Sequence, residues 1–252
     1  MHIQRVGFTP VKGGRHLEHD SAALDRHGVV GDRDFSLVDP ARGRVLKTVE
    51  NPALLSSCAH RDGDLLTIDI GDKTITALPR TTGEIIEMDY WGRPAAARLV
   101  EGPWAAAYTE LLGREVALIR SAVAGEFVYG ATITIVTTAS LRRLAELVGH
   151  EVRSERFRAN FVVDTDDLEP HVEDSWDGRE FQIGTARLRI RGGIDRCAVI
   201  DFDPETGASG TRLLRTLAGY RRHGRTIDFG VFAEVIVPGR IARGDRLTAI
   251  AG

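Results

Sequence analysis

Cysteine is scarce in this sequence, and its scarcity narrows what the chain can be. Only Cys58 and Cys197 occur among the 252 residues. Two thiols this far apart provide no disulfide framework and no C-x-x-C metal pair. Cys58 lies in the apolar run 54–59, where we expect a strand residue rather than a metal ligand.

Long apolar segments are absent as well. No run approaches the ~18 residues that a membrane span requires. Residues 1–6 have neither the apolar core of a signal peptide nor the basic amphipathic character of a transit sequence. We therefore expect a cytoplasmic protein, in a reducing compartment, that does not bind a membrane.

An excess of charge of either sign is missing too. The chain has 33 lysines and arginines against 36 acidic residues, a formal net charge of -3, so no global basic field indicates a nucleic-acid partner. Lysine itself is rare and occurs only as Lys12, Lys47 and Lys73. Nearly every basic residue is therefore an arginine, which suits the planar, bidentate recognition of phosphate.

The first part of the chain, residues 1–88, predicts a β-rich domain. Residues 61–64 (RDGD) are a strong hairpin signal between the run at 54–59 and a strand at 65–70. A further strand is expected at residues 44–49.

The remaining residues, 89–252, predict strands interrupted by a few helices. Helices are expected at residues 103–112, 138–148 and 211–222. Strands are expected at residues 115–119, 132–137, 180–183, 186–191 and 230–237. Many strands and few helices predict an α+β, mainly β fold with a β-barrel, and a chain of 252 residues can form two packed domains.

The reactive residues are expected directly after one of these strands, the one at 186–191. Residues 186–191 alternate apolar and basic, and we expect their three arginines to form a solvated strand face. Two glycines follow, and then Arg196 and Cys197. A thiol beside a cation favours the thiolate, the nucleophilic and soft-metal-binding form of cysteine. On these residues alone, a buried structural thiol is the favoured alternative.

A second candidate segment is residues 156–163 (RFRANFVV). If extended, it places Arg156, Arg158 and Asn160 on one face and apolar residues on the other. Burying such polar groups beside phenylalanines demands a partner for them. The helix expected to start at Thr138 also offers free N–H groups, which can bind an anion.

The order and spacing of these motifs resemble the MOSC domain family, named after the C-terminal domain of molybdenum cofactor sulfurases. The closer resemblance is to its two-part branch, which includes the mitochondrial amidoxime-reducing component and bacterial relatives. It covers nearly the entire chain through residues 10–12 (PVK), 31–35 (GDRDF), 138–141 (TASL), 156–160 (RFRAN), 196–197 (RC), 203–207 (DPETG), 238–239 (PG) and 244–245 (GD). It implies a MOSC-N-type β-rich domain at 1–88 and a MOSC β-barrel domain at 89–252.

The resemblance also implies a cofactor and the residues that hold it. Cys197 matches the cysteine that binds molybdenum, so the implied cofactor is the molybdenum cofactor, Mo-molybdopterin. The implied contacts to its pterin and phosphate are Lys12, Arg33, Ser140, Arg158, Asn160 and Arg196. The chain departs from the family pattern at Gly13, where serine or cysteine is frequent, and at Ala159, where proline is common.

The function that the resemblance implies is that of an oxidoreductase. It would abstract an oxygen atom from an N-oxygenated small molecule, with electrons from a separate flavin, iron–sulfur or heme protein. Asp195, close to the cysteine, is the candidate for moving protons. Two alternatives use the same thiol: a sulfurtransferase with a persulfide on Cys197, and a non-catalytic cofactor carrier. The sequence does not separate the three.

Overall fold

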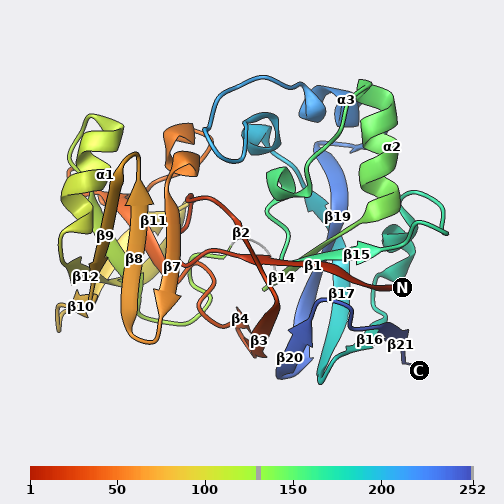
Figure 1. Cartoon of the computed structure of the whole chain (residues 1–252), viewed down its shortest axis with the longest axis horizontal. Coiled ribbons are helices and arrows are strands. Elements are labelled where there is room, and N and C mark those ends of the chain that lie inside the picture. The colour runs from red at the N-terminus through yellow and green to blue at the C-terminus, as the bar shows by residue number, and fades with distance from the viewer. Residues whose placement is uncertain (129–131, 251–252) are drawn as a thin grey trace.

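The computed structural model describes residues 1–128 and 132–250, and these form two lobes that lie side by side (Figure 1). The first lobe contains β5 (Phe35–Asp39), β6 (Arg44–Val45), η1 (Pro52–Ser56), β7 (Cys58–Asp62), β8 (Leu65–Ile70), β9 (Lys73–Ala77), β10 (Arg80–Thr81), β11 (Ile86–Tyr90), β12 (Arg93–Glu101), α1 (Trp104–Leu112) and β13 (Ala117–Ser121). β12 pairs with both β11 and β13, and this closes β5, β6, β11, β12 and β13 into a barrel.

The second lobe is built on a nine-stranded sheet, with α2 and α3 packed at one side (Figure 1). Its elements are β1 (His2–Phe8), β2 (Leu17–His19), β3 (Ser21–Asp25), β4 (Gly28–Val29), β14 (Ile133–Thr137), α2 (Thr138–Val148), η2 (Ser154–Phe157), β15 (Phe161–Asp164), η3 (Val172–Trp176), β16 (Glu180–Ile183), β17 (Ala186–Asp195), η4 (Ala198–Asp201), α3 (Leu213–Tyr220), β18 (Arg222–His223), β19 (Thr226–Val237), β20 (Gly239–Ala242) and β21 (Leu247–Ala249). The large sheet has the order β2-β1-β15-β14-β19-β17-β16-β21, with β18 on β19, while β20, β3 and β4 form a small sheet.

Strand pairing does not follow the order of the chain. β1 lies between β2 and β15, and β3 pairs with β20, so the first strands belong to the sheets of the second lobe. The first lobe is therefore inserted, in sequence, between β4 and β14. The proposed division between residues 88 and 89 stays a prediction, and it falls inside β11.

The predicted fold class, α+β and mainly β, is confirmed, and β17 shows why the pattern was informative. Leu188 and Ile190 are buried, whereas the intervening arginines are not. Arg189 and Arg191 both form ion pairs with Glu234 of β19. The arginines of this strand therefore form the outer face that the alternation predicts.

The three predicted helices are present, and the hairpin at residues 61–64 joins β7 to β8. α1 and α2 end at Gly113 (φ 65°) and Gly149 (φ 75°), which adopt the left-handed conformation common at helix ends. α3 is shorter than expected and spans Leu213–Tyr220.

Three of the predicted extended segments were wrong in part. The run 54–59 begins as η1, because Pro52 suits a helical first turn and Ser57 Oγ donates to Leu54 O at 2.7 Å. The strand at 44–49 is only two residues long. The segment at 156–160 is not extended, because Arg158 has a φ of 52° and turns the chain between η2 and β15.

Candidate functional site

Cys197 lies at the junction of β17 and η4. β17 ends two residues earlier, and Cys197 has extended backbone angles (φ -113°, ψ 175°) as the residue before η4. Its side chain is exposed, not sealed in a core. The alternative of a buried structural thiol is therefore excluded, and a ligand can reach the sulfur.

A cavity of about 240 Å³ opens beside this thiol, and residues of both lobes line it. We call it the Cys197 cavity. Lys12 and Arg33, which precede the first lobe, line it together with Tyr90 from the end of β11. The second lobe contributes Arg158 and Arg196. Residues far apart in sequence thus meet around one sulfur atom.

Backbone strain is concentrated at the Cys197 cavity. Four non-glycine residues in the described part of the chain have a positive φ: Arg33 (55°), Trp91 (59°), Arg158 (52°) and His171 (66°). All but His171 line the cavity. The left-handed conformation costs a residue with a side chain about 1–3 kcal/mol and is retained mainly where function requires it. Three of these four residues thus lie around one cavity, where Arg33 and Arg158 are outside any hairpin turn and Trp91 is in the turn between β11 and β12.

Arg33 and Arg158 hold each other in place. Arg33 Nη2 donates to the carbonyl oxygen of Arg158 at 3.2 Å, and its Nη1 lies 3.1 Å from Asp32 Oδ2. Arg158 Nη1 donates to the carbonyl oxygen of Gly14 at 2.7 Å. Each guanidinium group keeps N–H groups that these contacts do not use, and those can donate to a ligand.

Arg196 is fixed by backbone carbonyls at the other side of the thiol. Its Nε donates to Phe229 O at 2.7 Å and its Nη1 to Phe157 O at 3.0 Å. The guanidinium carbon lies 5.3 Å from the centre of the Phe157 ring. Its Nη2 is buried and has no hydrogen-bond partner within the described residues. An unpaired buried donor costs about 1–3 kcal/mol, so this atom favours an acceptor that the protein itself does not supply.

The Cys197 cavity carries a positive charge that the protein does not balance. Of Lys12, Arg33, Arg158 and Arg196, only Arg33 has an ion-pair partner among the described residues. Burial, followed by repulsion from Arg33, lowers the pKa of Lys12 to about 7 and that of Arg158 to about 9. Burial also lowers the pKa of Arg196 to about 10. In all three cases burial is the largest cause, and an anionic ligand in the cavity would stabilise the charged forms.

Asn160, predicted to contact a cofactor, lies behind the cavity wall. It is fully buried, its Oδ1 accepts from Thr134 N and Oγ1 (3.1 and 3.0 Å), and its Nδ2 donates to Asp32 Oδ2 at 3.0 Å. Asp32 in turn pairs with Arg33. Asn160 therefore supports a residue of the Cys197 cavity and does not line it.

Ser140, the other predicted contact, is also absent from the lining of the cavity. It is buried at the start of α2, where its Oγ lies 2.8 Å from Glu173 Oε1 and accepts from His171 N at 2.8 Å. Thr137 Oγ1 also lies 2.8 Å from Glu173. A buried carboxylate thus already occupies the surroundings of the α2 N-terminus, where we expected an anion site.

Asp195 lies at the mouth of the cavity, as its position before Arg196 and Cys197 suggests. Its Oδ1 accepts from Ile227 N at 2.9 Å, which fixes the carboxylate against β19. Sequence reasoning missed Tyr90, Trp91 and Phe127, which also line the cavity. Tyr90 and Trp91 lie in the Tyr-Trp-Gly turn between β11 and β12, but nothing in the local sequence shows that this turn or Phe127 lies at the same cavity as Cys197.

Gly13 accounts for one departure from the family pattern. It has a φ of 90°, and a Cβ there would lie 2.9 Å from Leu54 Cδ1. Any larger residue would be strained at this φ and would displace the end of the Leu54 side chain. The backbone beside Lys12 therefore takes a conformation in this chain that a serine or cysteine would not adopt readily.

Two family models match the chain in succession. The model of the MOSC N-terminal beta barrel domain matches residues 1–114, and the model of the MOSC domain matches residues 124–248. The first range contains most of the strands that close the barrel of the first lobe, and the second contains Cys197.

Curated relatives bear the name molybdenum cofactor sulfurase. The one from Oryza sativa subsp. japonica is 23% identical over 269 residues, covering 92% of this chain and 32% of that protein. The one from Solanum lycopersicum is 41% identical over 78 residues, covering 30% of this chain and 9% of that protein. The chain thus spans about a third or less of the length of these relatives.

Among solved structures, the YUAD protein from Bacillus subtilis is 14% identical, with a TM-score of 0.48 over 98% of this chain and 94% of that one. None of the helices within residues 1–128 and 132–250 has the length and apolar character that crossing a bilayer demands.

Proposed function

The chain belongs to the MOSC domain family, and we propose that it binds the molybdenum cofactor in the Cys197 cavity and reduces N-oxygenated small molecules. The observation that carries this proposal is an exposed thiol beside four buried or half-buried cations, of which one has an ion-pair partner in the described chain. Such a cavity fits an anionic ligand that also carries a soft metal.

The residues present fit the cofactor group by group. Thiolate is a ligand of the soft kind that molybdenum in sulfur coordination accepts, and Cys197 is exposed at the cavity where such a metal could reach it. Lys12, Arg33 and Arg158 would hold the phosphate, since guanidinium forks match phosphate oxygens. The unpartnered Nη2 of Arg196 would gain an acceptor from the bound group.

The reaction consumes two electrons and two protons: the N–O bond of a hydroxylamine breaks, and an amine and water leave. The bound cofactor supplies this two-electron oxygen-atom chemistry. The chain supplies orientation through Cys197, charge through the cavity arginines, and a carboxylate at the mouth through Asp195. Asp195 would pass protons between water and the substrate. The electrons would come from a separate flavin, iron–sulfur or heme protein.

The activity test uses reduced methyl viologen as donor and an N-hydroxylated amine as substrate. The wild type, produced in a host that makes the cofactor, is expected to release the amine. Cys197→Ala should lose this activity, whereas Cys58→Ala, a thiol remote from the cavity, should keep it. No amine from the wild type, or equal rates from all three proteins, would contradict the proposal.

A second candidate is a sulfurtransferase that carries a persulfide on Cys197. The exposure of the thiol and the name of the curated relatives favour it. Mass spectrometry after incubation with thiosulfate, which gives its outer sulfur to a thiolate and leaves as sulfite, would then show one added sulfur on the wild type and on Cys58→Ala, and none on Cys197→Ala. A cofactor carrier, the third reading, would hold molybdenum but would not turn over the substrate.

A further inference from the structure

One segment of the chain contains basic residues and no acidic ones. Residues 206–227 include five arginines and His223 but neither aspartate nor glutamate, in a chain with 36 acidic residues. The segment covers α3, β18 and the turn into β19. This local asymmetry contrasts with the small net charge of the whole chain.

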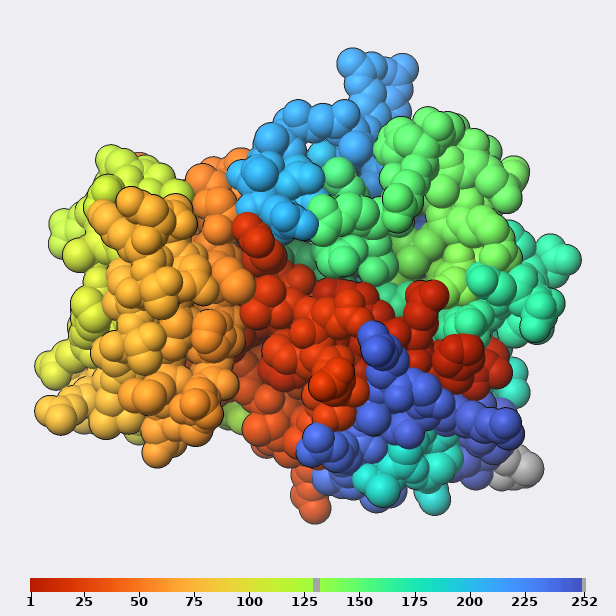
Figure 2. Space-filling view, viewed as in Figure 1, coloured from red at the N-terminus to blue at the C-terminus, as the bar shows by residue number. Residues whose placement is uncertain are grey.

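The structure places four of these arginines on the outside. Arg212, Arg215, Arg222 and Arg225 are exposed, and none forms an ion pair within residues 1–128 and 132–250. We call them the basic surface. The fifth, Arg221, is mostly buried and is neutralised by Asp174 at 2.7 Å. In the space-filling view the part of the chain around α3 lies at the top of the molecule, beside α2 (Figure 2).

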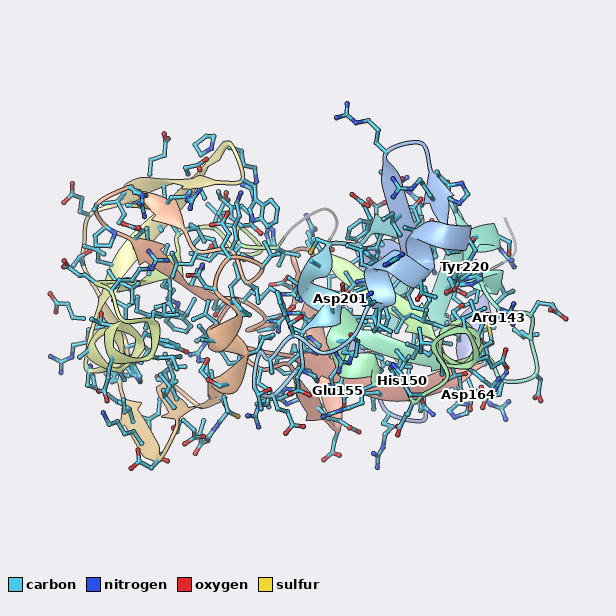
Figure 3. The ribbon with its side chains drawn as sticks, turned by 90° about the horizontal axis from the view of Figure 1, so that it is seen from above. Arg143, His150, Glu155, Asp164, Asp201 and Tyr220 are labelled. Atoms are coloured by element: carbon cyan, nitrogen blue, oxygen red, sulfur yellow. The ribbon has the colours of Figure 1, made fainter. Side chains whose placement is uncertain are left out.

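The helix that carries part of the basic surface packs directly on η4, which follows Cys197. Leu214 N, on α3, donates to Asp201 Oδ1 at 3.0 Å, and Thr211 Oγ1 donates to Asp201 O at 3.1 Å. Asp201 ends η4, the short helix that begins directly after Cys197. From above, Asp201 lies on the side of the second lobe that faces the first, and Tyr220, at the end of α3, lies farther out (Figure 3).

The turn after β18 is attached to the same site from its other side. Arg196 N donates to Ile227 O at 2.9 Å, and Ile227 N donates to Asp195 Oδ1 at 2.9 Å. The residues before and after Cys197 are therefore both hydrogen-bonded to the unit that carries the basic surface.

Unpaired like charges on one unit repel each other and lower stability. Arg212 directly precedes α3 and Arg215 lies in its first turn, so two exposed like charges are close in sequence without an intervening acidic residue. A partner of opposite charge removes this repulsion when it binds.

We propose that the basic surface is the docking site of a small acidic electron-carrier protein. This inference rests on the proposed function, which requires two electrons from outside. Two reduced carriers would each lose one electron in turn, while the substrate N–O bond breaks and takes up two protons to form water. Complementary charge accelerates such encounters at low salt. A nucleic acid fits less well, because the chain as a whole has a formal net charge of -3.

The test compares a triple variant, Arg215→Glu, Arg222→Glu and Arg225→Glu, with a matched control, Arg26→Glu, Arg80→Glu and Arg246→Glu. The control residues are also exposed, and no ion pair of theirs occurs in the described chain. The probe is an acidic [2Fe–2S] ferredoxin kept reduced by its NADPH-dependent reductase, with reduced methyl viologen as the reference donor. Circular dichroism confirms that each variant folds.

We expect the triple variant to raise KM for ferredoxin about tenfold or more and the control to change it less than about twofold. Turnover with methyl viologen should be the same in all three proteins. Increasing salt should slow the wild type with ferredoxin and have little further effect on the triple variant. Equal KM values in variant and control, or viologen-driven turnover without any turnover from ferredoxin, would overturn the docking site.

A calorimetric titration of the protein with ferredoxin tests the docking site independently of the proposed activity. If methyl viologen drives no turnover in the wild type, the proposed function fails, and calorimetric titration with ferredoxin still decides the docking. Weaker ferredoxin binding by the triple variant alone supports the basic surface. Absent or equal binding, or a duplex DNA that binds through these arginines in place of ferredoxin, overturns it.

Discussion

At the scale of single residues, Lys12 makes the charge of the Cys197 cavity depend on pH. Burial, together with Arg33 and Arg158, lowers its pKa to about 7. Without an anion, Lys12 is charged below this pH and neutral above it. An anion stabilises the charged form, so the affinity for sulfate should fall as the pH rises from about 6 to about 9. Sulfate suits this titration, because its own charge is constant over the range.

Two lysine variants check the origin of that pH dependence by calorimetry. Lys12→Met should bind sulfate weakly at every pH, without the decline above pH 7. Lys73→Met, which alters an exposed ion pair with Glu110 in the first lobe, should behave like the wild type. A decline that survives in Lys12→Met would assign the titration to another group.

Arg158 should contribute directly to anion binding, since no ion pair engages it in the described chain. Arg158→Gln removes the charge and keeps two N–H donors. A hydrogen bond to a charged group is worth about 1.5–3 kcal/mol, so Kd for sulfate should rise about tenfold or more. Arg187→Gln, on the outer face of β17, is the control and should leave Kd unchanged. Equal Kd values for both variants would rule out this role.

The motifs that carry the family resemblance were enough to select four cations of the Cys197 cavity. Lys12, Arg33, Arg158 and Arg196 lie in short motifs, and the structure places all four at the cavity. Ser140 lies in a motif of the same kind, but Glu173, 33 residues away, takes its hydroxyl. A single sequence shows which residues are polar, but it does not show which distant residue forms hydrogen bonds with them. The roles of all these residues in cofactor binding stay predictions.

At the scale of elements, the start of α2 depends on a buried polar cluster. Ser140 Oγ contacts Glu173, and Glu173 is completely buried. Ser140→Ala leaves this carboxylate with one hydroxyl fewer, so the free energy of unfolding should fall by about 1–3 kcal/mol. Sulfate affinity should not change, because Ser140 does not line the cavity. Ser175→Ala, at an exposed site, is the control for urea denaturation.

Loss of sulfate binding without loss of stability in Ser140→Ala would restore the role that the family resemblance implies for this residue. It would also mean that the contacts around Glu173 are weaker than their geometry suggests.

Glu173 should make stability depend on pH in the acidic range. Burial, only partly offset by bonds from Ser140 and Thr137, raises its pKa above 4.5. The folded state then binds a proton that the unfolded state has lost, so this residue's contribution to stability is largest below pH 4.5 and declines as the pH rises through the raised pKa. Glu173→Gln should remove that decline in urea unfolding curves. If the free energy of unfolding declined equally with pH in the wild type and in Glu173→Gln, this role of Glu173 would be contradicted.

The sequence predicted helices and strands whose pattern is local, but it did not predict the residues at which they begin and end. The left-handed glycines that end α1 and α2 are visible in the sequence, as is the alternation of β17. The turn at Arg158 is not, because an arginine at a positive φ contradicts local preference and is stabilised by contacts with Arg33 and Gly14.

At the scale of the whole molecule, the N-terminal strands complete the sheets of the second lobe. β1 lies between β2 and β15, so residues 89–252 without β1 would expose the edge of β15. We expect the fragment 89–252 to be unfolded or aggregated alone. A well-dispersed NMR spectrum of that fragment would show instead that residues 89–252 are an independent domain.

The central claim is that one thiol and the cations around it hold a molybdenum cofactor. The most direct test measures molybdenum and released pterin together in wild type, Cys197→Ala and Cys58→Ala from a cofactor-producing host. We predict about one equivalent of each in the wild type and in Cys58→Ala, with molybdenum lost or sharply reduced in Cys197→Ala. Wild-type protein without molybdenum, or the same content in Cys197→Ala, would contradict the account.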